Sequence, residues 1–168
     1  EKPEMSVSAK TNQVEADMIA AMVERIFRQA DRFDYSATVG VIVPYRNQIA
    51  TVRNAIDRYG IPALHSITID TVERFQGSQR DYIIYGLTVQ QRCQLNFLTD
   101  NVFEEDGTLI DRKLNVAMTR ARKHLTIVGN PDILAGSAVY RRLMDFMKSR
   151  GCYFNVACEK FCAGDFSV

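Results

Sequence analysis

The sequence lacks the compact signatures of a self-contained nucleotide-binding or hydrolytic enzyme. It has no G-x-x-x-x-G-K-[ST] phosphate loop and no G-x-G-x-x-G fingerprint, since Gly40 and Gly60 are isolated and Gly77 is followed by Ser78. No hydrophobic stretch ends in paired acids that could hold Mg²⁺, and the nucleophile-elbow and zinc-protease patterns are also missing. These absences argue against a complete NTPase, dehydrogenase or hydrolase.

Long apolar runs are absent too. No run approaches the roughly 20 residues that cross a bilayer, and residues 1–10 are too polar for a signal peptide. We therefore expect no membrane contact and a cytoplasmic location, either the bacterial cytosol or another intracellular compartment. Because the sequence does not begin with Met, we also expect it to be a fragment of a longer chain.

Cysteine and histidine are scarce, with four and two residues. Cys152, Cys158 and Cys162 fall near the end, but no C-x-x-C pair and no nearby His accompany them. Reduced thiols of a cytoplasmic protein account for this pattern better than metal ligands do. We predict no metal site.

The composition fits one soluble domain with a single core, because 46% of the 168 residues are hydrophobic and 24% are charged. The net charge of +1 hides an uneven distribution. Basic residues crowd into residues 112–123 and 141–150, whereas residues 104–106 are acidic. A local positive surface is therefore expected.

Helical and strand patterns alternate along the chain, which is typical of parallel βαβ units. The first expected helix begins after Asn12, and three more cover residues 49–56, 114–121 and 137–148. The expected strands cover residues 39–43, 67–69, 82–89 and 125–128, with a further candidate at 153–156. Residues 90–108 show no clear period and are expected to form a long surface loop. The sequence predicts an α/β fold with a mainly parallel sheet covered on both faces. Such sheets bind ligands beyond the carboxyl ends of their strands.

Three segments carry the strongest motifs. They are residues 39–48 (VGVIVPYRNQ), 67–84 (ITIDTVERFQGSQRDYII) and 112–129 (RKLNVAMTRARKHLTIVG). In this order they resemble motifs IV, V and VI of superfamily 1 helicases, in the branch of the nonsense-mediated-decay RNA helicase and the replication helicase-nuclease. The last segment is the most specific, and the resemblance covers about residues 11–147.

This resemblance implies two RecA-like domains in the intact protein, with ATP and Mg²⁺ in the cleft between them and single-stranded DNA or RNA across their top. The chain matches only the second domain, so residues 1–168 would form one RecA-like helicase C-terminal domain. The first RecA-like domain of the same polypeptide would be its partner and would bind most of the ATP and Mg²⁺. The resemblance also implies 5′ to 3′ movement.

Arg120 is the strongest catalytic candidate. Phosphoryl transfer needs positive charge where the transition state gains negative charge, and an arginine supplied across an interface provides it. Arg120 lies late in a helix between the small residues Thr119 and Ala121, and the resemblance implies contact with the γ-phosphate. The alternative is a solvated helix arginine, which is also the default interpretation of Arg122.

Two other groups of residues are expected to bind ATP. The resemblance implies that Tyr45 serves the base and Arg46 the γ-phosphate, although packing at a strand end explains Tyr45 equally well. Gln76 and Gln79 could bond the ribose or phosphates, while Gly77 supplies a backbone shape that a Cβ would forbid. Many family members carry Glu where this chain has Gln79, which leaves the ribose contact open.

Asp70 and Thr71 lie where the second domain touches the nucleic-acid backbone in the family, and Thr119 is assigned to the same role. A hydroxyl and exposed amides suit phosphate oxygens. Thr71 could equally cap the turn that follows it. The two histidines, His65 and His124, have no recognisable catalytic partner and are expected to be structural.

The resulting hypothesis is an ATP-dependent helicase or translocase on single-stranded DNA or RNA. This chain would supply the arginine finger and nucleic-acid contacts and would be inactive alone. One alternative is a degenerate helicase half that binds nucleic acid or protein without hydrolysis. Another is an unrelated α/β nuclease, for which only the acidic residues 104–106 offer carboxylates.

Overall fold

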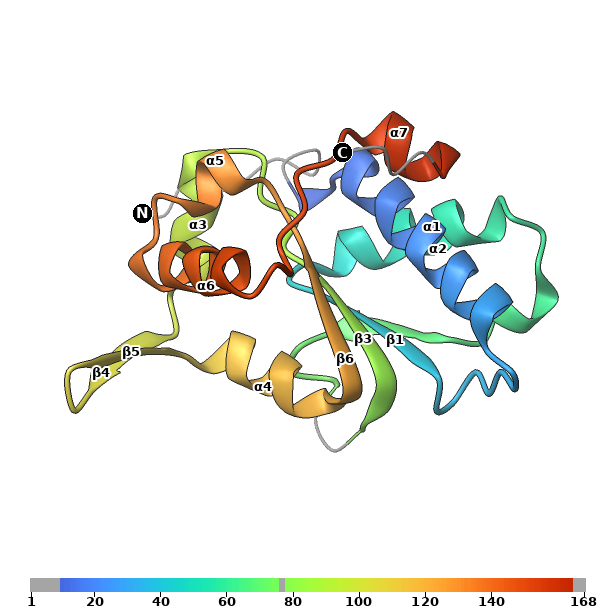
Figure 1. Ribbon diagram of the computed structural model, residues 1–168, viewed down its shortest axis with the longest axis horizontal. Coiled ribbons are helices and arrows are strands. Elements are labelled where there is room, and N and C mark those ends of the chain that lie inside the picture. Colours follow the sequence, from blue (N-terminus) through green and yellow to red (C-terminus); the bar gives the residue numbers. More distant parts are fainter. Residues whose placement is uncertain (1–9, 76–77, 165–168) are drawn as a thin grey trace.

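The computed structural model describes residues 10–75 and 78–164, and its centre is a four-stranded parallel sheet (Figure 1). The strand order is β2-β1-β3-β6, and the register pairs Val41 of β1 with Ile69 of β2 and Ile84 of β3. The strands are β1 (Val39–Val43), β2 (Thr68–Thr71), β3 (Arg80–Gly86) and β6 (Ala121–Val128). The predicted α/β, RecA-like class with a mainly parallel sheet is confirmed.

Helices cover both faces of this sheet. They are α1 (Gln13–Gln29) and α2 (Arg46–Asp57) on one face, and α3 (Arg92–Leu98), α4 (Arg112–Arg120), α5 (Pro131–Leu134) and α6 (Ala138–Ser149) on the other. A short 3₁₀ turn, η2 (Pro62–Leu64), precedes β2, and α7 (Cys158–Ala163) packs on α1. Within the described residues, no helix is long and apolar enough to cross a membrane.

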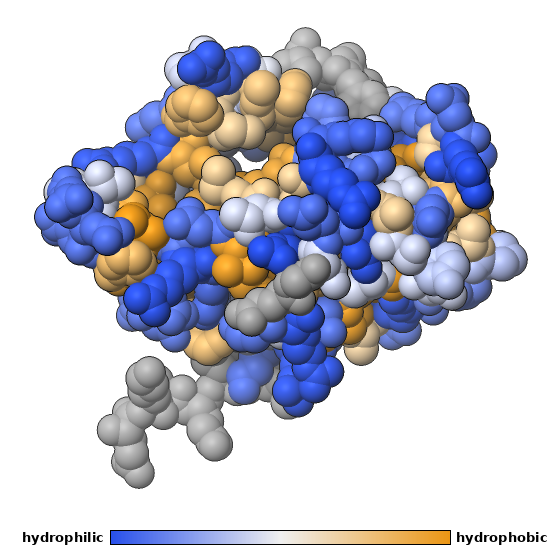
Figure 2. All heavy atoms as spheres, turned by 90° about the horizontal axis from the view of Figure 1, so that it is seen from below, coloured by the Kyte–Doolittle hydropathy of each residue, from blue (hydrophilic) through white to orange (hydrophobic). Residues whose placement is uncertain are grey.

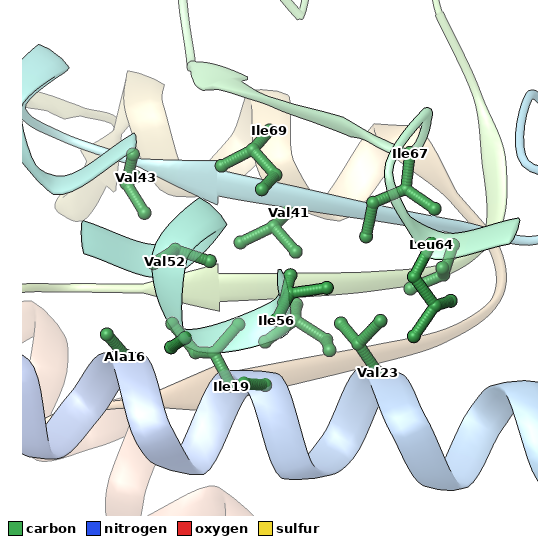
Figure 3. Close-up of a cluster of buried hydrophobic side chains, with 14 of the residues drawn as sticks. Ala16, Ile19, Val23, Val41, Val43, Val52, Ile56, Leu64, Ile67 and Ile69 are labelled. Atoms are coloured by element: carbon green, nitrogen blue, oxygen red, sulfur yellow. The ribbon is translucent and has the colours of Figure 1, made fainter. Parts of the chain in front are cut away.

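The core on the α1 side follows from helical spacing. Ala16, Ile19 and Val23 lie three to four residues apart, so they share one face of α1 and point at the sheet (Figure 3). Val41 and Val43 alternate on the facing side of β1. Asn12 begins the helix as expected, because its side chain accepts a hydrogen bond from the Glu15 amide.

The opposite core contains larger side chains. The side chains of Tyr85, in β3, and Leu87, just after it, lie on the other face of the sheet. They pack with Leu98 of α3, Leu114 of α4 and Tyr140 of α6. All five are almost fully buried. The helix α4, which carries the most specific motif, is therefore fixed to the sheet by its apolar side.

The prediction of an irregular loop over residues 90–108 is wrong. Gln91 and Gln94 form a capping box that starts α3. The segment continues into a hairpin of β4 (Val102–Glu105) and β5 (Thr108–Asp111) that projects from the body (Figure 1). Asp106 and Gly107 both have positive φ, as a tight hairpin turn requires, and Asp-Gly is a strong signal for that turn.

The expected strand at residues 153–156 is also wrong, because this segment has no regular secondary structure and does not pair with the sheet. It connects α6 to α7, a helix that the sequence interpretation did not include. Arg25 of α1 lies over the Phe161 ring at 4.4 Å from its centroid and helps hold α7.

Candidate functional sites at the two edges of the sheet

The parallel topology divides the predicted site residues between two edges. Because all four strands run in one direction, their carboxyl ends share one edge and their amino ends share the opposite edge. Tyr45 and Arg46 follow the carboxyl end of β1, and Asp70 and Thr71 end β2. At the amino edge lie the predicted residues Gln79, Thr119 and Arg120, which precede β3 and β6.

At the amino edge, the end of α4 meets the start of β3. The Gln79 Nε2 donates to the Thr119 carbonyl oxygen at 3.3 Å, which brings the second and third motifs together. Thr119 Oγ1 donates to the Val116 carbonyl at 2.9 Å and accepts from Arg120 Nη2 at 3.2 Å. Two motifs distant in sequence therefore form one surface.

Arg120 is half-buried at this surface, and its guanidinium lies against the Thr119 hydroxyl. Within the part of the chain that the structure describes, no carboxylate pairs with it. Arg122 and Lys123 differ, since both approach Asp81, at 3.9 and 2.8 Å. The Asp81 carboxylate also raises the pKa of Lys123. Arg120 keeps most of its donors available to an anionic ligand.

Arg80 is a structural arginine that the sequence interpretation missed. Its Nη2 donates to Thr68 Oγ1 at 3.0 Å, and its guanidinium lies 5.6 Å from the centroid of the Phe75 ring. Burial lowers its pKa, and the nearby Arg122 lowers it further. The Phe75 ring in turn needs Gly40, because a Cβ there would lie 2.5 Å from Phe75 Cζ.

The charges at the amino edge are mainly positive. Arg80, Arg120, Arg122 and Lys123 gather here, and the described carboxylates that act on them are Asp81, beside Arg122 and Lys123, and Asp34, whose charge acts on Arg80. The α4–β6 junction lies at the bottom of Figure 1, and Figure 2 views the molecule from that side. Hydrophilic side chains there surround separate hydrophobic areas (Figure 2). This edge suits an anion such as a phosphate group.

The carboxyl edge is built differently. The Tyr45 ring is 7% exposed and stacks on Phe97, with 4.9 Å between centroids. Burial raises the pKa of Tyr45 to about 12. Arg46 starts α2 and is exposed. The Tyr45 ring thus packs at the strand end, and the sheet separates it from Arg120.

Thr71 begins a turn at the same edge. Its amide donates to Asp70 Oδ1 at 2.8 Å, and its carbonyl accepts from the Phe75 amide at 3.0 Å. Gln76 and Gly77, the other predicted ATP-binding residues, lie outside the described residues.

A buried carboxylate at this edge also escaped the sequence interpretation. Glu15 is 3% exposed, and its two oxygens accept from the Thr88 amide at 2.9 and 2.8 Å. Burial raises the Glu15 pKa to about 8, against the opposing effect of the hydrogen bonds from Thr88 and the Leu87 amide. In the sequence, Glu15 is simply an acid in the first helical turn, so no local signal marks it.

The remaining candidates make structural contacts. His65 Nδ1 lies 2.8 Å from Asp57 Oδ1, and the His124 ring stacks on Tyr82 at 5.4 Å between centroids. Cys158 and Cys162 bring their sulfurs to 3.7 Å on one face of α7. Among the residues with described positions, no group of three or more His, Cys, Asp or Glu side chains could hold a metal ion.

Known proteins include several relatives of this chain. Residues 1–132 match the family described as AAA domain. The chain is 33% identical over 141 residues to Helicase sen1 of Schizosaccharomyces pombe and 31% identical over 154 residues to Helicase SEN1 of Saccharomyces cerevisiae, covering 83% and 90% of this chain. It is 36% identical over 118 residues, 67% of this chain, to the regulator of nonsense transcripts 1 homolog of Drosophila melanogaster.

The chain spans only 8%, 6% and 9% of the lengths of these three relatives. All three come from eukaryotes, so they give no support to the expected bacterial cytosol.

Proposed function

This chain belongs to the AAA domain family, as a C-terminal helicase domain of the superfamily 1 branch that contains Sen1 and the regulators of nonsense transcripts. From that premise we propose that it is the second motor domain of an ATP-dependent helicase or translocase. The substrate is single-stranded RNA or DNA. The first RecA-like domain lies in the same polypeptide and completes the ATP site.

The observation that carries this proposal is the position of Arg120 and its lack of a described carboxylate partner. It ends α4 on a positive edge, and no described carboxylate pairs with it. We assign it to the γ-phosphate of ATP bound by the first domain, where a planar, permanently charged donor stabilises the transition state. Gln79, bonded to the Thr119 carbonyl, lies next to this position and contacts the ribose.

The two edges have separate tasks in this proposal. Strands rise about 3.3 Å per residue, and the carboxyl ends therefore lie well over 10 Å from Arg120. Arg46, Asp70 and Thr71 contact the sugar–phosphate backbone there, and Thr119 belongs with the nucleotide side by position. Tyr45 supports Arg46 by packing on Phe97 and does not reach a nucleotide held at Arg120.

The residues of this chain fit the triphosphate better than the metal. The amino edge offers arginines, and no described cluster of three acids or other metal ligands is present. Mg²⁺, which neutralises charge on the β- and γ-phosphates in phosphoryl transfer, is therefore held mainly by the first domain. This chain orients the γ-phosphate and the ribose.

A degenerate half-helicase that binds nucleic acid without hydrolysis is the competing function. The intact protein separates the two, because a motor hydrolyses ATP faster when single strands are present. The test measures ATP turnover with and without oligo(U) and oligo(dT), together with movement along each. Turnover that no strand stimulates would reject the motor and leave the binding module.

A further inference from the structure

Glu15 and Thr88 form a buried, hydrogen-bonded contact. Thr88 lies just beyond β3 and has φ +60°, a region that β-branched residues rarely adopt. Its amide donates to both Glu15 oxygens, and its hydroxyl donates to Glu15 Oε1 at 3.2 Å. Gly86 leaves the necessary space, since a Cβ there would lie 2.7 Å from Glu15 Oε1. Three residues thus maintain one uncommon backbone conformation.

The same region ties the start of α1 to the loops at the carboxyl edge. Gln48 of α2 is fully buried, and its amide group bonds the Asn12 backbone in both directions, at 2.8 and 2.9 Å. On the other side, the Gln90 side chain donates to the Thr11 carbonyl. Gln94 Oε1 accepts from the Gln90 amide at 2.7 Å. The start of α2 and the loop after β3 are therefore both anchored to the start of α1.

Three exposed residues follow Thr88: Gln90, Gln91 and Arg92. Because β3 lies beside β1, this loop is next to the one that carries Arg46. The Arg92 guanidinium and the Gln91 side-chain NH2 group suit the sugar–phosphate backbone and read no base sequence, whereas the Gln90 side chain already donates to the Thr11 carbonyl. The loop that Thr88 leads into thus extends the proposed strand-binding edge.

We propose that Glu15 is a positioning residue for single-strand binding: it holds Thr88 in the left-handed conformation and so places residues 90–92 against the strand backbone. This role rests on the proposed function. It concerns the backbone of a single-stranded nucleic acid, and it involves no contact between Glu15 and the strand.

The test measures the affinity of the full chain for labelled oligo(U) and oligo(dT) at low salt, beside a melting curve. Glu15→Ala leaves the Thr88 amide without its acceptor, and we expect roughly tenfold weaker binding, as small misplacements of contact groups cause. Glu15→Gln keeps an acceptor oxygen and is expected to stay within about threefold of wild type. Burial raises the Glu15 pKa to about 8, so a neutral amide is a close mimic near pH 7.

Two matched variants separate positioning from stability. Val23→Ala opens a cavity on the same helix, about 12 Å along its axis from Glu15. It should lower the melting temperature while leaving affinity unchanged. Asp17→Asn alters a partly exposed acid on α1 and should change neither.

If folded Glu15→Ala bound the oligonucleotides as tightly as wild type, the role of Glu15 would be overturned. The same holds if Val23→Ala lost as much affinity for them as Glu15→Ala. Both results would leave the proposed function intact. Absence of binding by the wild-type chain to either oligonucleotide would overturn strand binding itself, and the positioning role with it.

Discussion

Two arginines near the end of α4 have different surroundings. Arg120 rests on the Thr119 hydroxyl, whereas Arg122 lies 3.9 Å from Asp81 on β3. Two positions apart, they point in different directions. A ligand that approaches the amino edge therefore meets them unequally, which makes their comparison informative.

Arg120→Ala in the intact protein should reduce ATP turnover roughly 10³–10⁵-fold, the value of an arginine finger in other phosphoryl-transfer enzymes. Arg120→Lys should restore little, because Lys keeps the charge and loses the planar fork. Turnover rates and melting curves would be measured. Arg122→Ala is the control and should change little; equal losses at both positions would reduce the role of Arg120 to general positive charge.

The buried Glu15 predicts a pH dependence of stability. Its folded pKa of about 8 lies above the usual value near 4.5, so the folded state binds the proton more tightly than the unfolded state does. The stabilisation is complete below about pH 4.5 and is lost as the pH rises toward 8. Over that window, the free energy of unfolding should fall by at most about 1.4 kcal/mol per pH unit relative to Glu15→Gln. Denaturant unfolding across the window checks this, and parallel curves for the two proteins would contradict it.

At the scale of elements, α4 connects the projecting hairpin to the amino edge. Asp111 ends β5 and caps α4 by accepting from the Leu114 amide at 3.0 Å. Its other oxygen accepts from the buried Tyr140 hydroxyl at 3.2 Å, which joins α4 to α6. One side chain therefore sets both the start of α4 and its attachment.

Asp111→Ala should lower the free energy of unfolding by about 2 kcal/mol or more, because it removes a helix cap and leaves the Tyr140 hydroxyl without an acceptor. Asp111→Asn keeps the cap acceptor in its one amide oxygen, and its NH2 group can donate to the Tyr140 hydroxyl oxygen, so it should cost clearly less. Chemical denaturation of the three proteins gives the comparison. Equal stability of wild type and Asp111→Ala would show that α4 does not depend on this cap.

At the scale of the whole molecule, the two edges predict the ATP hydrolysis and the single-strand binding of this chain in the absence of the first domain. It should hydrolyse no ATP, because it contains no phosphate loop. It should bind single strands weakly and without sequence preference, and raising the salt from about 50 to 200 mM should weaken binding about tenfold or more through counterion release. Titrations at two salt concentrations with two unrelated sequences test this. Salt-independent or strongly sequence-selective binding would contradict the strand-binding edge.

Local patterns determined much of this protein. The β-branched run at residues 39–43 and the cap at Asn12 act within a few residues, so the strand and helix appear where the sequence places them. The motif at residues 112–129 likewise identifies the family from the sequence alone. The hairpin was missed although Asp106-Gly107 marks it, because its neighbours carry no regular period.

Only the tertiary structure decided which predicted residues share a surface. Strand direction is a non-local property, and it puts Gln79 beside Thr119, some forty positions away, while it sends Tyr45 to the opposite edge. Burial is non-local as well. Glu15 resembles any acid of a first helical turn, and it becomes a buried acceptor only because the segment after β3 brings Thr88 beside it.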